Sequence, residues 1–411
     1  MNATLKETIA DVMTRQRAGQ FALLTKLVQT PTETRGDGLM KAAEKIAELL
    51  EDMEFEVERH APDKERLEAA GRAPMQNLVI RKRFSDGPVL ALVSHVDTVE
   101  AHTSWTFDPH GGDIVDGRLY GLGVASGKGH LAAQLYAMQS LIKFGADVKG
   151  AIELHVSFDG ESGGTFGAKW LLAEGIVKPD KVIAGGPARA VATHSTGTMV
   201  MNVEVRGKAA PAHAPEEGAD ALEAASHALA RLYQFRGGLK SHVSGIPGLG
   251  APSLVIETIN GGDDAGGVPD FVTFRLDRRM LPDEDPAQVE KQLTNLIGST
   301  IAKMPGTRCR IRRAALIPAM GSSNDTEALT GVLHKRLQSK IGNAGEPYGI
   351  AYEHEGRHYA AAGVPTVMYG AGPIDTVEAA LHGPDEHLLL DDLRVATEVL
   401  ALSAMDLLSA K

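Results

Sequence analysis

The sequence predicts an α/β protein in which a mainly parallel sheet is flanked by helices and a smaller α+β domain is inserted. Apolar strand segments alternate with amphipathic helical segments in residues 1–192 and again in residues 317–411. In residues 193–316 the order changes to β-α-β-β-α-β with half-exposed strands, which is typical of a ferredoxin-like domain. We therefore expect one discontinuous α/β domain, 1–192 with 317–411, and one inserted domain, 193–316.

The first domain is predicted from segments that switch between strand and helix patterns. Two helices precede a strand around Glu54–Val57, and a helix that ends in glycine follows "GKGH". The remaining segments are the strands "NLVIRKR", "PVLALVSHVD", "AIELHVSFD", "KVIAGG" and "TVMYG", and the helices "FGAKWLLAEG" and "LRVATEVLALSAMDLL".

The inserted domain is predicted from segments with alternating polarity and two helical stretches. They are the strands "TMVMNVEVRG", "SLVIETING" and "FVTFRLDRRM" and the helices Ala219–Tyr233 and Pro286–Ile301.

Length and composition exclude several classes of protein. A chain of 411 residues is too long for one ordinary core, and 43% hydrophobic with 23% charged residues is typical of a globular protein. A net charge of −11 argues against a nucleic-acid partner. The single cysteine, Cys309, excludes an internal disulfide. Because the N-terminus lacks a signal-peptide core and no apolar run could span a bilayer, we expect a cytoplasmic protein with no membrane partner.

Several ordered motifs resemble one enzyme family. They are "SHVDTV", "WTFDPHGGDIVDGRLYGLG", "VSFDGESGG", "INGG", "VPDFVTFRLDRRMLP", "AGVPTVMYGAGP" and "LHGPDE". Together they resemble the di-zinc aminoacylases and carboxypeptidases that include acetylornithine deacetylase, succinyl-diaminopimelate desuccinylase and the glutamate carboxypeptidases. The resemblance covers nearly the whole chain. It implies a small-molecule substrate and a homodimer formed through the inserted domain.

Four residues match the family's metal-binding and supporting positions. His95 falls on the histidine of the first metal, and Asp97 on the aspartate that orients this histidine. Glu161 falls on the glutamate of the second metal, and His382 on the C-terminal histidine. The resemblance therefore implies His95, Glu161 and His382 as metal ligands, with Glu161, His382 and Asp97 as catalytic residues.

The carboxylates at the centre of the family's chemistry are absent. The residues at the bridging aspartate, the general base and the acidic ligand of the first metal are Ser126, Gly160 and Gly186. A neutral serine brings no charge with which to bridge two cations, so we expect either one Zn²⁺ or other divalent metal, or no metal. Pro211 replaces the histidine that the family contributes to its partner subunit, and His213, two residues on, is a candidate replacement.

Other residues are candidates for binding or catalysis. Arg279 matches the family's arginine, and "EHEGRHY" adds His354 and Arg357, which we interpret as substrate-binding. His354 and His358 have the spacing of two ligands on a helix face, although a solvated helix start explains them as well. Ser126 is a candidate nucleophile with Lys128, although this lysine also matches an ordinary turn residue of the family.

Four glycines stand where the family places larger polar side chains. They are Gly160, Gly186, Gly266 and Gly356. One interpretation is a cavity enlarged for a bulkier or more anionic ligand, and the other is a set of backbone turns. We also expect hydrolysis of N-acyl amino acids to be very weak and to be partly restored by Ser126→Asp, Gly160→Glu and Gly186→Glu together.

Three functions remain open at this point. The first is a divergent zinc aminoacylase- or peptidase-like hydrolase with an incomplete di-metal site, acting on an amide-type small molecule that bears a carboxylate. The second is a non-catalytic binding protein on the same scaffold. The third is non-hydrolytic isomerase or lyase chemistry in the same cavity.

Overall fold

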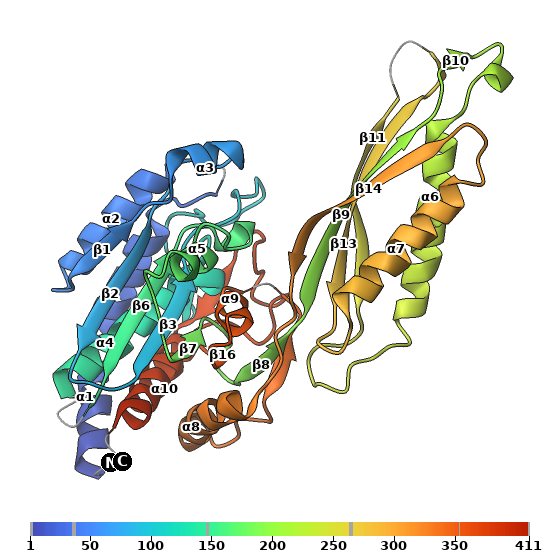
Figure 1. Cartoon of the computed structure of the whole chain (residues 1–411). Helices are drawn as coiled ribbons and strands as arrows, with labels where there is room; N and C mark the ends of the chain where they lie inside the picture. Colours follow the sequence, from blue (N-terminus) through green and yellow to red (C-terminus); the bar gives the residue numbers. More distant parts are fainter. Residues whose placement is uncertain (1–2, 35–37, 145–147, 263–265, 353, 410–411) are drawn as a thin grey trace. The chain divides into compact units, whose positions relative to one another are not determined.

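The chain forms two compact units in the computed structural model, which describes residues 3–34, 38–144, 148–262, 266–352 and 354–409 (Figure 1). The first unit comprises Met1–Thr193, Ser322–Tyr348 and Glu353–Lys411, and the second comprises His194–Gly321 and Gly349–Tyr352. The predicted class, a mainly parallel α/β sheet with an α+β insertion, is confirmed.

An eight-stranded sheet forms the centre of the first unit, in the order β1-β2-β6-β3-β7-β16-β8-β15. The four central strands, β6, β3, β7 and β16, run parallel, whereas β1, β2 and β8 pair antiparallel. The strands are β1 Val57–His60, β2 Asn77–Arg83, β3 Val89–His95, β6 Ala151–Ser157, β7 Lys181–Ala184, β8 Ala192–Ser195, β15 Tyr348–Ile350 and β16 Thr366–Met368.

Helices cover both faces of this sheet. α4 and α10 pack against one face with α1 beside them, while α5 and α9 lie over the other face (Figure 1). The helices are α1 Ala3–Val28, α2 Leu39–Glu51, α3 Lys64–Ala69, α4 Gly129–Phe144, α5 Ala168–Ala173, α8 Asn324–Ile341, α9 Gly356–Ala361 and α10 Leu390–Leu408. No helix in the described part of the chain is both long and apolar enough for a membrane span.

The central strand β6 presents different chemistry on its two faces. Ile152, Leu154 and Val156 belong to the main hydrophobic core. The alternate residues His155 and Ser157 are equally buried, but they hydrogen-bond to α9 and to the residue that precedes it. Because side chains alternate along a strand, the α9 face of β6 is a buried polar strip that leads to the candidate site.

Several short elements form the loops that lie at the carboxyl ends of the parallel strands. A three-stranded sheet, β17-β5-β4, joins the C-terminal histidine motif to the loop before α4. These elements are β4 Ile114–Val115, β5 Arg118–Tyr120, β17 His387–Leu389, a π-helical turn Val124–Lys128 and a 3-10 turn Gly160–Ser162.

The second unit is an antiparallel sheet, in the order β11-β13-β9-β14, packed on two helices. Asp220 and Asp285 begin the helices by accepting N–H groups of the first turn, which is normal N-capping. The predicted helix Pro286–Ile301 is confirmed, and the other helix is longer than predicted. The elements are β9 Gly197–Arg206, β10 Ala210–Pro211, α6 Ala221–Leu239, β11 Ser253–Gly261, β12 Gly267–Val268, β13 Phe271–Met280, α7 Pro286–Ile301 and β14 Arg308–Ile317, with a 3-10 turn Pro215–Glu217.

The predicted strand around Glu54–Val57 is misplaced. Glu54 has φ 66°, which is the left-handed region, and it lies in the turn after α2. β1 begins only at Val57, because this turn separates the helix from the strand.

Candidate active site

Asp97 organises the end of β3. His95 is the last residue of this strand, and its Nδ1 lies 3.3 Å from Oδ1 of the buried Asp97. The two carboxylate oxygens of Asp97 also accept the backbone N–H groups of Gly160, at 2.8 Å, and of Glu161, at 3.0 Å. One buried carboxylate therefore orients the imidazole of His95 and holds the turn that carries Glu161.

Glu161 and His382 meet across two loops. Glu161 follows β6, and His382 precedes β17 with φ 62°. Their Oε1 and Nε2 atoms are 3.0 Å apart, yet Oε1 makes no hydrogen bond of good geometry to the described residues. Burial lowers the pKa of His382, but the contact with Glu161 and the charge of Glu386 shift this pKa above its ordinary value.

The pKa of His95 is shifted much further. Burial alone would lower it, but the hydrogen bond and charge of Asp97, with the charges of Glu161 and Glu355, raise it to about 10. These acidic neighbours therefore favour the protonated, imidazolium form of the His95 ring.

The donor set does not fit a two-metal centre. No three His, Cys, Asp or Glu side chains within the described ranges are arranged as ligands of one ion. Glu161 and His382 are the exception to this poor fit: Oε1 of the carboxylate lies 3.0 Å from Nε2 of the imidazole. Two ligands that each stand about 2.0–2.2 Å from a zinc ion would have a similar separation.

The glycine at the general-base position is closely packed. A Cβ atom on Gly160 would lie 2.3 Å from Cγ of His95 and 2.6 Å from its Cβ. The side chain of His95 therefore occupies the space that a larger residue at position 160 would need.

Two other glycines are enclosed as well. A Cβ atom on Gly186 would lie 2.7 Å from the carbonyl carbon of Met368, and one on Gly356 would lie 2.9 Å from Cβ of Ala184. The interpretation of these residues and Gly160 as a cavity enlarged for a ligand is wrong. Of the four glycines, Gly266 alone has no described residue within 4 Å of the Cβ position, and its φ of 70° is a turn conformation that favours glycine.

Glu386 supports the loop that carries Ser126. Its fully buried carboxylate accepts the N–H groups of Gly123, at 3.1 Å, Ala125, at 2.8 Å, and Ser126, at 3.2 Å. Lys128 donates from Nζ to the carbonyl oxygen of Thr30, at 3.2 Å. Burial lowers the pKa of Lys128 to about 8 against the charges of Glu33 and Glu386.

Ser126 does not form the contact that a serine–lysine nucleophile requires. Its Oγ is buried and has no hydrogen-bond partner among the residues that the structure describes. Because Nζ of Lys128 is directed at Thr30, the hydrogen bond of the proposed pair is not formed.

The α9 segment holds the turn of Glu161. Nη2 of Arg357 donates to the carbonyl oxygen of Gly163 at 3.2 Å, and Nε2 of His358 lies 2.9 Å from the same oxygen. His354 precedes α9 and Nε2 of His358 contacts backbone, so the two histidines do not stand on one helix face as their spacing suggested. Arg357, predicted to bind substrate, makes a supporting contact here.

Two buried groups lie just before α9. Ser157 donates a hydrogen bond to Glu355, and burial raises the pKa of this carboxyl to about 8. His354 is buried and neither of its ring nitrogens has a partner among the described residues, while burial lowers its pKa to about 3. The substrate-binding role predicted for His354 therefore stays a prediction.

The second unit holds the remaining predicted site residues. His213 is exposed in the loop after β10. Arg279 lies on β13, where Nε is 3.0 Å from Oδ1 of Asp277 and Nη2 is 3.2 Å from Oδ2. Arg279 therefore forms a two-point ion pair within its own unit, and the roles predicted for both residues stay predictions.

Sequence reasoning missed two residues. Glu386 stands inside the quoted motif "LHGPDE", but only the fold shows that it accepts three N–H groups. His130 follows the "GKG" turn at the start of α4 and is 6% exposed, with Nδ1 3.1 Å from the backbone nitrogen of Ala371. The available signal was a histidine among the apolar and small residues of the first helical turn, "GHLAA".

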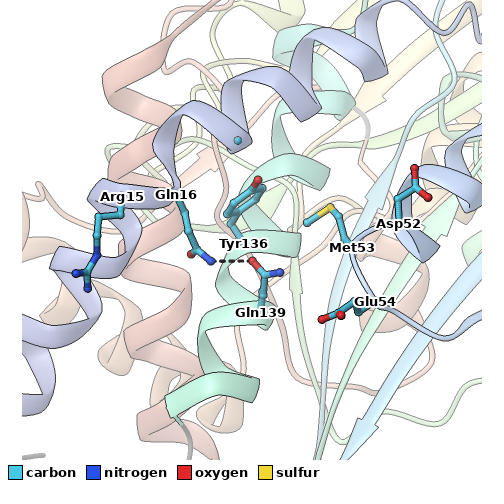
Figure 2. A pocket seen from close by; sticks show the side chains of 8 residues that line it. Arg15, Gln16, Asp52, Met53, Glu54, Tyr136 and Gln139 are labelled. Carbon is cyan, nitrogen blue, oxygen red and sulfur yellow. Dashed lines mark hydrogen bonds between the residues drawn. The ribbon is translucent and has the colours of Figure 1, made fainter.

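A cavity of about 450 Å³ lies elsewhere in the first unit (Figure 2). Arg15, Asp52, Glu54 and Tyr136 are among its lining residues, and Gln16 and Gln139 hydrogen-bond within it at 3.1 Å. None of its lining residues is a candidate site residue, so it is separate from the site described above.

Solved structures of other proteins share the fold of this chain. Human carnosine dipeptidase 1 matches with a TM-score of 0.74 at 16% identity, covering 98% of each chain. The metallo-carboxypeptidase Sso-CP2 from Sulfolobus solfataricus matches with a TM-score of 0.74 at 16% identity, covering 94% of this chain and 98% of that one. The chain therefore has the fold of a group of metallopeptidases.

Sequence comparison identifies the family. The model of peptidase family M20/M25/M40 matches residues 91–406, so the chain belongs to this family of hydrolases. Acetylornithine deacetylase from Vibrio campbellii is 27% identical over 383 residues, 92% of this chain and 94% of the relative. Acetylornithine deacetylase from Myxococcus xanthus is 27% identical over 316 residues, 76% and 78% of the two chains. The resemblance inferred from the motifs is confirmed.

Proposed function

We propose that this chain is a divergent hydrolase that acts on an amide-type small molecule bearing a carboxylate, with an incomplete metal centre of at most one divalent ion. The contact between Oε1 of Glu161 and Nε2 of His382, which are 3.0 Å apart, carries the proposal. The substrate class rests on the relatives called acetylornithine deacetylase, since an acetylated amino acid contains both an amide and a carboxylate.

Each retained residue has a distinct task in this proposal. Glu161 and His382 would hold the ion, which when bound polarises a carbonyl group and lowers the pKa of water. Asp97 fixes the orientation of His95 and of the turn of Glu161 through its three contacts. Glu386 fixes the loop of Ser126, which faces the same edge of the sheet.

The purified protein is expected to hold fewer than two zinc ions per chain, because Ser126 and Gly186 supply no carboxylate. Elemental analysis after expression in zinc-supplemented medium and dialysis measures this directly. Replacing both Glu161 and His382 by glutamine should remove the bound zinc, whereas His387→Gln, a histidine change five residues away, should leave it. Two tightly held ions per chain would show that other residues complete the centre.

Turnover of N-acetyl and N-succinyl amino acids tests the reaction. Losing a general base typically costs about 10²–10⁴-fold in rate, so weak cleavage that depends on Glu161 and His382 is expected.

The second candidate function is a binding protein. It is favoured because the ring of His95 packs against Gly160, the residue at the general-base position. Binding in calorimetry without any product would support that candidate, and a product with its amide intact would support isomerase or lyase chemistry.

The second unit is expected to join two copies of the chain into a homodimer. Val255, 51% exposed, and Phe271, 36% exposed, are large apolar residues of its sheet. Their neighbours Leu254 and Val272 pack toward the helices, so both exposed residues lie on the uncovered face. Light scattering at micromolar concentration should give twice the chain mass, and Phe271→Lys should reduce it. A monomeric natural protein would refute the expectation.

A further inference from the structure

His130 sits in a space built by glycines. It is the second residue of α4, and the whole residue is 6% exposed. Cβ atoms would lie 2.4 Å from Cδ2 if placed on Gly185, 2.6 Å from Nδ1 on Gly370 and 2.8 Å from Cε1 on Gly372. Only residues without side chains at these three positions leave room for the imidazole.

The hydrogen bond of His130 fixes its tautomer. Nδ1 accepts the backbone N–H of Ala371 at 3.1 Å, so the proton of the neutral ring is on Nε2. Burial and the charge of His95 lower the pKa of His130 to about 3, which keeps the ring neutral. Nε2 therefore presents one N–H donor, and it has no hydrogen-bond partner within the described ranges of the chain.

The glycines around this ring lie at the functional edge of the sheet. Gly185 directly follows β7, and Gly370 and Gly372 follow β16, so all three stand at the carboxyl ends of parallel strands. His95, at the end of the neighbouring strand β3, is near enough for its charge to act on His130. Ligands of open parallel sheets bind at this edge.

We propose that the Nε2–H group of His130 donates a hydrogen bond to a carbonyl or carboxylate oxygen of the bound substrate. The neutral ring offers this N–H group at the edge of the sheet where ligands bind, and a substrate oxygen would accept its hydrogen bond. The inference rests on the proposed function, because it assumes that a carboxylate-bearing amide occupies this site. His130 holds the substrate by a neutral donor and transfers no proton.

Two substitutions separate this role from a structural one. In His130→Asn, Oδ1 can replace Nδ1 as the acceptor for Ala371, but no donor reaches the position of Nε2. In His130→Gln the amide group reaches that position. With N-acetyl-L-ornithine as the probe, calorimetry should show Kd raised about 5–20-fold in His130→Asn and less in His130→Gln. The melting temperature of His130→Asn should stay near that of the natural protein.

Histidine ¹⁵N resonances of the natural protein give an independent readout. The free protein should show His130 as the Nε2–H tautomer, and the probe should shift this signal. An Nδ1–H tautomer, or unchanged affinity in His130→Asn, would overturn the inference. If the probe shifts His95 and His382 but not His130, only this inference fails. If no histidine responds to the probe, the proposed substrate class fails together with it.

Discussion

Gly186→Glu is expected to lower the free energy of unfolding by about 3 kcal/mol or more. A Cβ atom at this position would lie 2.7 Å from the carbonyl carbon of Met368 and 2.8 Å from the backbone nitrogen of Tyr369. Backbone of a buried strand cannot move aside as a flexible side chain can, and the new carboxylate would be buried as well. Urea unfolding measures the loss.

The triple variant Ser126→Asp, Gly160→Glu and Gly186→Glu is therefore expected to fold poorly and not to regain hydrolysis. At position 160 the new side chain must displace the ring of His95 and with it the contact to Asp97. Gly266→Asn is the matched control, because nothing lies within 4 Å of that Cβ position and asparagine tolerates a φ of 70°. A stable triple variant that hydrolyses N-acetyl amino acids would show that His95 moves freely.

Glu386→Ala is expected to produce the second large effect. It would leave the buried N–H groups of Gly123, Ala125 and Ser126 without their acceptor. Each unsatisfied buried donor costs about 1–3 kcal/mol, so a loss of about 3–6 kcal/mol follows if the loop relaxes only in part. Urea unfolding gives the size of the effect, and faster amide hydrogen exchange at residues 123–126 gives its location.

Two glutamate variants serve as controls for this result. Glu386→Gln keeps one carbonyl acceptor but turns an amide N–H toward a backbone donor, so an intermediate loss is expected. Glu378→Ala removes a half-exposed glutamate that pairs with Arg118 at 3.2 Å, and it should change stability by less than about 1 kcal/mol. Equal effects of Glu386→Ala and Glu378→Ala would contradict the role assigned to Glu386.

Local pattern was enough to predict much of the fold. The N-cap Asp285 and the first-turn proline of the helix Pro286–Ile301 are adjacent. The local sequence therefore indicates where this helix begins. The strands of the second unit alternate in polarity with the period that a half-exposed sheet requires. The strand after α2 was misplaced because a left-handed turn residue, Glu54, has no local signal.

Residue types alone show which of the family's site groups are absent from this protein and which are present. A serine at 126 and a glycine at 160 carry no carboxylate in any fold, and His95, Asp97, Glu161 and His382 stand in motifs whose order identifies the family.

The contacts made by the site glycines and by Glu386 can be seen only in the folded chain. Gly160 packs on His95, Gly185 and Gly370 enclose His130, and Glu386 binds backbone more than 250 positions away in the chain. These are contacts between distant segments, set by how strands and loops meet at one edge of a sheet. Propensity and periodicity describe neighbours along the chain, so they carry no information about such contacts.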